Sequence, residues 1–131
     1  MTFNFKFSGI ILASALATLS LSKPAQAGFC GNYIQISSNA GNCDTCRLQI
    51  ADNPETESYF VTANNGWEAE LTWSHGDEQM AIGTGSWKRN VGHSLAGKSF
   101  DIDLNQQERR LNMIMSLPGS GPIKATYLCL D

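Results

Sequence analysis

Two histidines are the first candidates for catalytic or metal chemistry in this chain. His75 and His93 are its only histidines. His75 lies in a predicted turn beside Asp77 and Glu78, where nitrogen and oxygen ligands could gather, although a solvated hairpin tip explains the same residues. His93 precedes Ser94 in a glycine-rich loop, but a triad requires groups that converge from separate elements. Both histidines are therefore predicted to be loop residues of a possible binding surface.

Paired carboxylates form the second candidate. Glu68 and Glu70 alternate along one predicted strand, and Asp101 and Asp103 alternate along another. Two carboxyl groups across a cleft can act as acid and base in glycoside hydrolysis. Alternating acids also arise simply because the outer face of a strand is wet. We expect the second explanation to hold.

Trp87 is the strongest binding candidate. The predicted strand that contains it ends beside Lys88 and Arg89, just before a glycine-rich loop. An exposed indole flanked by cations suits stacking on a sugar ring or anchoring a protein partner. A place in the core is an equal alternative for Trp87, whereas Trp67 and Trp73 are predicted to be core residues.

The elements that position these residues are short strands. From Trp67 to Trp73 apolar and polar residues alternate, which is the period of a strand buried on one face. The same pattern recurs along the chain. The predicted strands cover residues 33–37, 46–50, 58–63, 66–74, 79–88, 98–104, 111–117 and 123–130. Only 105–117 also fits a helix, because Asn105 and Glu108 resemble a helix cap, and there a strand is favoured.

Turn residues separate these strands. Asn64-Asn65-Gly66 predicts a hairpin with a type I′ turn. Gly83 and Gly85 interrupt a strand, which indicates a bend in a closing sheet more than a contact with a ligand. About eight strands without a clear helix predict an all-β fold, a small antiparallel barrel or sandwich stabilised by disulfides.

The first residues predict export. Residues 1–27 combine a basic start, an apolar stretch from Phe7 to Leu21 and an A-x-A site ending at Ala27, the pattern of a secretory signal peptide. Residues 28–131 then form one domain in a secreted or periplasmic protein. The apolar stretch is too short for a membrane span, and no second one follows.

The predicted mature domain is acidic. The chain has nine basic and 12 acidic residues, and removal of Lys6 and Lys23 leaves seven basic ones and a net charge of −5. Such a surface repels nucleic acid and would suit a basic protein partner, although modest acidity also serves solubility.

All four cysteines lie in the predicted domain: Cys30, Cys43, Cys46 and Cys129. In an exported protein they favour structural disulfides over a redox C-x-x-C or a zinc site, since no second pair stands at zinc spacing. Four cysteines permit three pairings. The pairing predicted here joins Cys30 to Cys43 and Cys46 to Cys129.

The predicted function is that of an exported, non-enzymatic binding module without a cofactor or metal. Its ligand, a glycan or another small ligand, would contact Trp87, Lys88, Arg89, His93 and His75. The alternative is an inhibitor whose acidic face docks on a basic secreted hydrolase such as a lysozyme. A hydrolase that uses a histidine and a carboxylate is the third hypothesis. Small exported barrels include lectins, inhibitors and lipocalin-like carriers, an analogy of fold alone.

Overall fold

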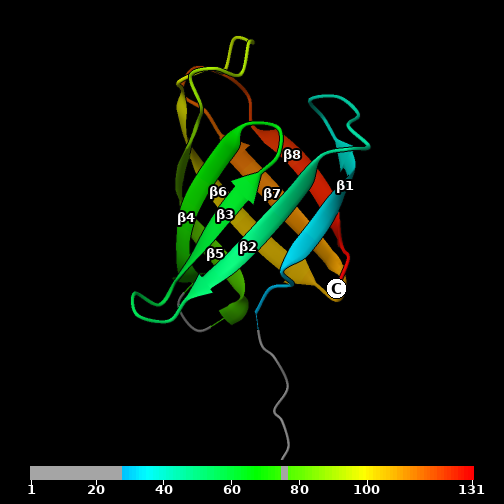
Figure 1. The fold of residues 1–131 in the computed structure, drawn as a ribbon, viewed down its shortest axis with the longest axis vertical. Helices are drawn as coiled ribbons and strands as arrows, with labels where there is room; N and C mark the ends of the chain where they lie inside the picture. Colours follow the sequence, from blue (N-terminus) through cyan, green and yellow to red (C-terminus); the bar gives the residue numbers. More distant parts are fainter. Residues whose placement is uncertain (1–27, 75–76) are drawn as a thin grey trace, which may run out of the picture.

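The protein is a closed barrel of eight antiparallel strands, as the computed structural model shows for residues 28–74 and 77–131 (Figure 1). The all-β prediction is confirmed, and of its two alternatives the barrel is correct. The strands are β1 Asn32–Ser38, β2 Arg47–Asn53, β3 Ser58–Ala63, β4 Trp67–Ser74, β5 Asp77–Trp87, β6 Ser99–Gln107, β7 Arg110–Ser116 and β8 Ile123–Cys129.

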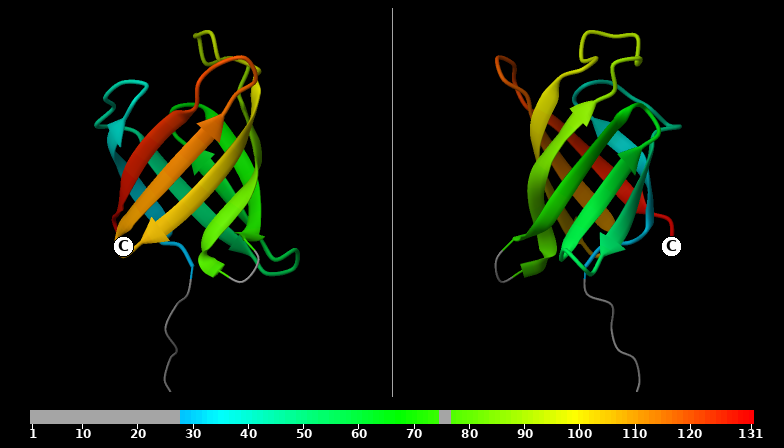
Figure 2. Two further views of the ribbon diagram at one scale, coloured as in Figure 1. Left: turned by 180° about the vertical axis from the view of Figure 1, so that it is seen from behind. Right: turned by 60° about the vertical axis from the view of Figure 1, so that its left-hand side comes forward.

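Each strand pairs with the next, and β1 pairs with β8, so that no strand in the barrel is left with an open edge. This up-and-down order divides the connections between two ends (Figures 1 and 2). One end, here called the loop end, carries residues 39–46, 64–66, 88–98 and 117–122. The other, the terminal end, carries residues 28–31, 54–57, 108–109 and 130–131.

Alternation along the strands builds the core. In β7, Leu111, Met113 and Met115 are buried while the residues between them are exposed. The segment 105–117, which also fitted a helix, is thus the end of β6, a turn and β7, and the strand prediction is confirmed. The outward-facing acids Glu70 and Asp101 are exposed, as an outer strand face requires.

The tryptophan predictions differ in outcome. Trp67 is a core residue, 1% exposed, as predicted. Trp73 is 47% exposed, so its prediction as a core residue was wrong. It lies at the end of β4, where the barrel stops, and its ring stacks on Tyr59 with centroids 6.1 Å apart. A side chain at an inward-facing position is buried only where the neighbouring strands continue on both sides of it.

Two glycines let neighbouring strands approach closely. A Cβ atom at Gly83 would collide with the carbonyl oxygen of Glu70, and one at Gly85 with that of Glu68. These glycines therefore permit β5 to lie tightly against β4. Gly66 closes the β3–β4 hairpin with a φ of 114°. The predicted hairpin is therefore present. A type I′ turn needs a positive φ at both of its central residues, and Asn65 has none, so the predicted turn type was wrong.

The disulfides join different partners from those predicted. Cys30 is bonded to Cys129, and Cys43 to Cys46, with Cα–Cα distances of 6.0 and 5.4 Å. The reason is the closure of the barrel: β1 lies beside β8, with Tyr33 opposite Cys129, which brings the first residues to the last strand. All four cysteines are paired. These bridges are compatible with an oxidising extracellular or periplasmic location.

Two predictions fall outside the described residues. The predicted signal peptide covers residues 1–27, and His75 is in the β4–β5 turn; neither segment is described by the structure. Within residues 28–74 and 77–131, no helix is long and apolar enough to cross a membrane.

Candidate functional site

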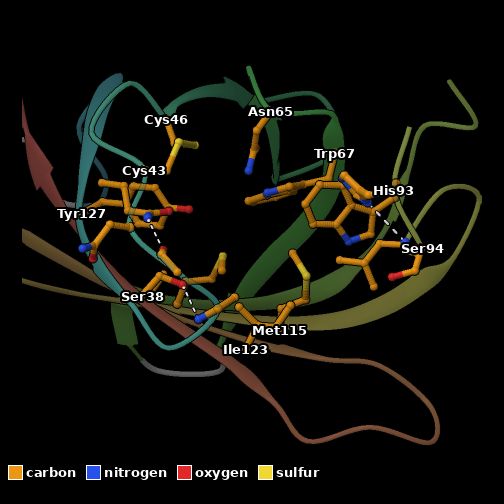
Figure 3. Close-up of a pocket in the computed structure, with 18 residues that line it drawn as sticks. Ser38, Cys43, Cys46, Asn65, Trp67, His93, Ser94, Met115, Ile123 and Tyr127 are labelled. Atoms are coloured by element: carbon orange, nitrogen blue, oxygen red, sulfur yellow. Dashed lines mark hydrogen bonds between the residues drawn. A yellow bond between two sulfur atoms is a disulfide. The ribbon is translucent and has the colours of Figure 1, made fainter. Parts of the chain in front are cut away.

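A cavity of about 470 Å³ occupies the barrel interior at the loop end (Figure 3). It combines buried side chains of the core with exposed residues of the loops, such as Asn42 and Asn65, so it opens to solvent. Its lining consists of Gln35, Ser38, Ala40, Gly41, Asn42, Cys43, Cys46, Asn65, Trp67, Trp87, His93, Ser94, Leu95, Met113, Met115, Ile123, Ala125 and Tyr127.

Two tryptophans from adjacent strands form one side of the cavity. Trp67 begins β4 and Trp87 ends β5, and the two are paired in the ladder. Backbone hydrogen bonds hold the second one: the Trp87 N–H donates to the carbonyl of Lys98 at 2.9 Å, and its carbonyl accepts the N–H of Gly97 at 3.1 Å. The loop after β5 thus fixes the position of the Trp87 backbone.

The inner faces of β7 and β8 form another side. Met113 lies opposite Ala125, and Met115 opposite Ile123. A single methyl group at Ala125, where a larger residue would fill the interior, leaves room for the cavity. Methionine side chains adapt to ligands of different shape because they are unbranched and polarisable.

Tyr127 completes this side, and burial raises the pKa of its hydroxyl well above the ordinary value. The hydroxyl is therefore neutral at physiological pH. For Tyr127 no hydrogen bond to another described residue is seen. In Figure 3, Tyr127 lies across the cavity from Trp67 and His93.

The β1–β2 loop forms part of the rim. The Cys43–Cys46 bridge closes a tight turn at the end of this loop, and the Cys46 carbonyl accepts the backbone N–H of Gln35 at 2.9 Å. The Gln35 side chain in turn donates to the carbonyl of Gly41 at 3.5 Å. The bridge therefore belongs to the wall of the cavity as well as to the stability of the loop.

Trp87 is buried beside the cavity. It is 6% exposed, so the prediction of an exposed indole was wrong and the core alternative is correct. Its Nε1 atom is buried and has no hydrogen-bond partner in the part of the chain that the structure describes. Leaving a buried donor unpaired costs about 1–3 kcal/mol. The ring also contacts His93 edge to face, with centroids 5.0 Å apart.

Of the four predicted ligand-contacting residues that the structure describes, two lie together, while His75 lies outside the described residues. Trp87 and His93 line the cavity, and the His93 Nδ1 atom accepts the backbone N–H of Leu95 at 3.2 Å. Lys88 and Arg89 are exposed and do not line it. Since β5 ends at Trp87, the residues after it leave the barrel wall and turn to solvent.

The residues of β7 and β8 that line this cavity were not predicted as site residues. Met113, Met115 and Tyr127 alternate along their strands in the same way as ordinary core residues, so their pattern gave no sign of an internal space. The small Ala125 on an inward-facing position was the available signal. A barrel of eight strands has an interior that side chains just fill, so a small inward residue leaves a cavity where no larger neighbour fills the space.

Among the described residues that line the cavity there is no Asp, Glu, Lys or Arg, and His93 is the one imidazole. Within this part of the chain the lining therefore places no carboxylate beside His93. Elsewhere, one group of potential metal ligands within residues 28–74 and 77–131 lies close together: Cys30, Cys129 and Asp131. Cys30 and Cys129 form a disulfide with each other, so their sulfurs are not free thiolates.

The fold and the cavity define the protein as an eight-stranded up-and-down barrel with an internal site that opens at one end. Comparison of the chain with protein-family models, with curated proteins and with solved structures finds no significant match. The argument for a function therefore rests on the geometry of this site.

Proposed function

We propose that this protein is an exported, non-enzymatic binding module that holds a small, largely apolar ligand inside the loop end of its barrel. The cavity carries this proposal: about 470 Å³ is within the range of sites for small molecules, about 300–1,000 Å³. Its lining combines buried tryptophan, methionine and tyrosine side chains with a few polar groups at the rim, as such sites do.

The geometry favours a small ligand over a glycan. Stacking on a sugar needs an exposed aromatic face, and Trp87 is buried. The cations Lys88 and Arg89 that were expected beside the ligand do not line the cavity. Burial of an apolar ligand against Trp67, Met113 and Met115 supplies the binding free energy instead.

The test uses N-phenylnaphthylamine, an uncharged apolar dye that fluoresces when it leaves water. We expect saturable fluorescence enhancement with the natural sequence. Ala125→Phe places a ring in the cavity and should weaken dye binding by about tenfold, which corresponds to about 1.4 kcal/mol. The control is Lys124→Phe, which adds the same ring on the exposed face of the same strand.

Two results would count against this proposal. One is the absence of dye binding to the folded protein. The other is an equal loss of binding in Ala125→Phe and Lys124→Phe, because binding on the outer surface would then explain the signal. Circular dichroism of each variant confirms that the barrel is intact before binding is measured.

An inhibitor of a basic secreted hydrolase is the second candidate, and the strand register favours it. Glu70 lies opposite Thr84, which lies opposite Asp101, and all three are exposed. Glu68 and Asp103 extend this acidic face along β4 and β6. The face would attract a basic enzyme such as a lysozyme in low salt.

This second candidate has its own test. Inhibition of a basic lysozyme should weaken as salt rises, and Glu70→Gln with Asp101→Asn should reduce it. Ala125→Phe, whose substitution lies inside the barrel, should leave inhibition unchanged. Inhibition that is absent at low salt, or that survives the neutral substitutions, excludes the acidic face.

A further inference from the structure

Two buried polar side chains lie side by side in the wall of the loop-end cavity. Gln35 of β1 and Tyr127 of β8 are directly paired in the ladder, and both line the cavity. Gln35 is 9% exposed and Tyr127 is 2% exposed. Ile123 begins β8 at the loop end, and Tyr127 stands four residues further along the strand. The pair therefore lies deep in the barrel, away from the rim.

Each of these two side chains has an atom without a partner. The Gln35 amide nitrogen donates to the Gly41 carbonyl at 3.5 Å, and its amide oxygen has no partner among the described residues. The Tyr127 hydroxyl has no partner there either. Because the Gly41 carbonyl can only accept, the nitrogen of the Gln35 amide faces it and the oxygen stays available.

The Tyr127 hydroxyl is reached from the cavity. Among the described residues, the one unpaired side-chain nitrogen or oxygen that is sealed from solvent is Trp87 Nε1. The Tyr127 hydroxyl is unpaired as well, so it is not sealed. Since Tyr127 is almost fully buried and lines the cavity, the space that reaches its hydroxyl is the cavity itself. In Figure 3, Tyr127 lies across this space from Trp67 and His93.

The pair of polar atoms discriminates between ligands. A hydrocarbon in the cavity would displace water from both atoms and leave them unpaired, which opposes binding. A ketone accepts from the Tyr127 hydroxyl but has nothing to donate to the Gln35 oxygen, whereas a hydroxyl group can do both. A carboxylate would lose its hydration, and the described lining contains no Lys or Arg to compensate it.

We propose that the cavity binds an uncharged, largely apolar alcohol or phenol whose hydroxyl group accepts a hydrogen bond from Tyr127 and donates one to Gln35 Oε1. This inference rests on the proposed function, since it names the ligand class of the same site. The apolar body of the ligand packs against Met113 and Met115 and extends towards the loop end.

The experiment compares three probes of nearly equal shape: 1-indanol, which donates and accepts, 1-indanone, which only accepts, and indane, which does neither. Their dissociation constants come from displacement of N-phenylnaphthylamine. Tyr127→Phe should lower the preference for indanol over indane, and for indanone over indane, by about fivefold, the effect of one net hydrogen bond. Gln35→Met should lower the preference for indanol alone. Tyr33→Phe makes the same change in a buried tyrosine that does not line the cavity, and it should retain both preferences.

A second measurement needs no substitution. In an NMR spectrum of the protein with bound indanol, the proton on the carbon that carries the hydroxyl should show nuclear Overhauser contacts to the Tyr127 ring. Contacts from that proton to the methyl groups of Leu95, in the loop at the rim, would place the hydroxyl at the opposite end and overturn the proposal.

The outcomes separate the ligand class from the proposed function. If the preference for indanol survives Tyr127→Phe, if Tyr33→Phe lowers it equally, or if no probe displaces a dye that binds, the hydroxyl class is wrong while binding of a small ligand stands. If the dye itself does not bind to the folded protein, the proposed function fails as well.

Discussion

The two ends of the barrel differ in how completely their buried polar groups are paired. At the terminal end, the Tyr33 hydroxyl donates to Gln106 Oε1 and accepts the Cys30 N–H at 2.7 Å, and the Gln106 amide donates to the Glu108 carbonyl at 3.3 Å. At the loop end, the Gln35 amide donates to the Gly41 carbonyl at 3.5 Å, but the Trp87 indole N–H has no partner among the described residues. The terminal end is thus held by a connected set of side-chain hydrogen bonds, whereas the loop end keeps a buried donor unpaired within the described chain.

Aromatic packing follows the same division. At the terminal end, Phe29 meets Tyr59 edge to face at 5.0 Å, and Tyr59 stacks on Trp73, so the rings cover one another. At the loop end, the rings of Trp67, Trp87 and Tyr127 surround an open space. Aromatic side chains therefore pack against one another at the terminal end and line a cavity at the loop end.

The two disulfides are expected to show the largest difference in stabilisation between the two ends. The Cys30–Cys129 bridge joins residues 99 apart at the terminal end, and Cys43–Cys46 joins residues three apart at the loop end. On the chain-entropy model, the long bridge contributes about 4.7 kcal/mol and the short one about 2 kcal/mol. Replacement of each pair by serine should lower Tm far more for the long bridge.

Thermal unfolding followed by circular dichroism checks this prediction. The Cys30→Ser/Cys129→Ser variant should lose about 20 °C or more, since 1 kcal/mol corresponds to about 4–8 °C in a domain of this size. Equal losses in the two double variants would show that the short bridge also holds long-range structure, which would contradict the division between the ends.

The second prediction compares two buried alanines. Ala81 is 0% exposed, lies opposite Leu104 in the ladder and does not line the cavity, whereas Ala125 does. Ala81→Phe forces a ring into filled space and should cost about 1–3 kcal/mol. Ala125→Phe enters empty space and should leave Tm unchanged or raise it. A loss of Tm in Ala125→Phe as large as that in Ala81→Phe would mean that the cavity cannot accept a ring.

The sequence predicts the barrel better than it predicts the site. Hydrophobic alternation is a local pattern, so the strands, including the ambiguous β7, could be read without knowledge of the fold. The disulfide pairing depended on barrel closure, which sets Tyr33 opposite Cys129 across almost the whole chain. No local pattern carries that information, and the predicted pairing was wrong for this reason.

The burial of the tryptophans shows even more clearly that a local sequence pattern lacks information on the whole barrel. Alternation correctly gives the inward face of β4, but it does not tell where along the strand the barrel interior begins and ends. Trp73 therefore was expected to be buried and is half exposed, while Trp87, beside two exposed cations, is buried. Burial at the end of a strand depends on neighbouring loops, here the residues after β5 that hold the Trp87 backbone.

The third prediction compares two tyrosines whose pKa is raised, in each case chiefly by burial. Tyr33→Phe removes the hydroxyl that bonds Gln106 and Cys30, so it should cost about 1–2 kcal/mol. Tyr127→Phe removes a hydroxyl without a partner among the described residues and should change Tm little. Chemical denaturation of both variants measures the difference, and a larger cost for Tyr127→Phe would reveal a hydrogen bond inside the cavity.

The smallest expected effect concerns a carboxylate at the terminal end. Asp131 accepts the Gly31 backbone N–H and the Asn32 side-chain amide, and chiefly the first bond lowers the pKa of this carboxyl below its ordinary value. A lowered pKa in the folded state stabilises the protein above the unfolded-state pKa, and this contribution is lost as pH falls through the folded-state pKa.

Asp131→Asn should therefore lower Tm slightly at neutral pH, and the difference from the natural sequence should vanish in strong acid. Asp44→Asn, in an exposed loop at the loop end, is the control. Because the Asp131 carboxylate is fully exposed, solvent screens its interactions and the effect stays below that of the other variants. A difference that persists unchanged in acid would mean that Asp131 holds the first residues to the barrel through its shape alone, not through its charge.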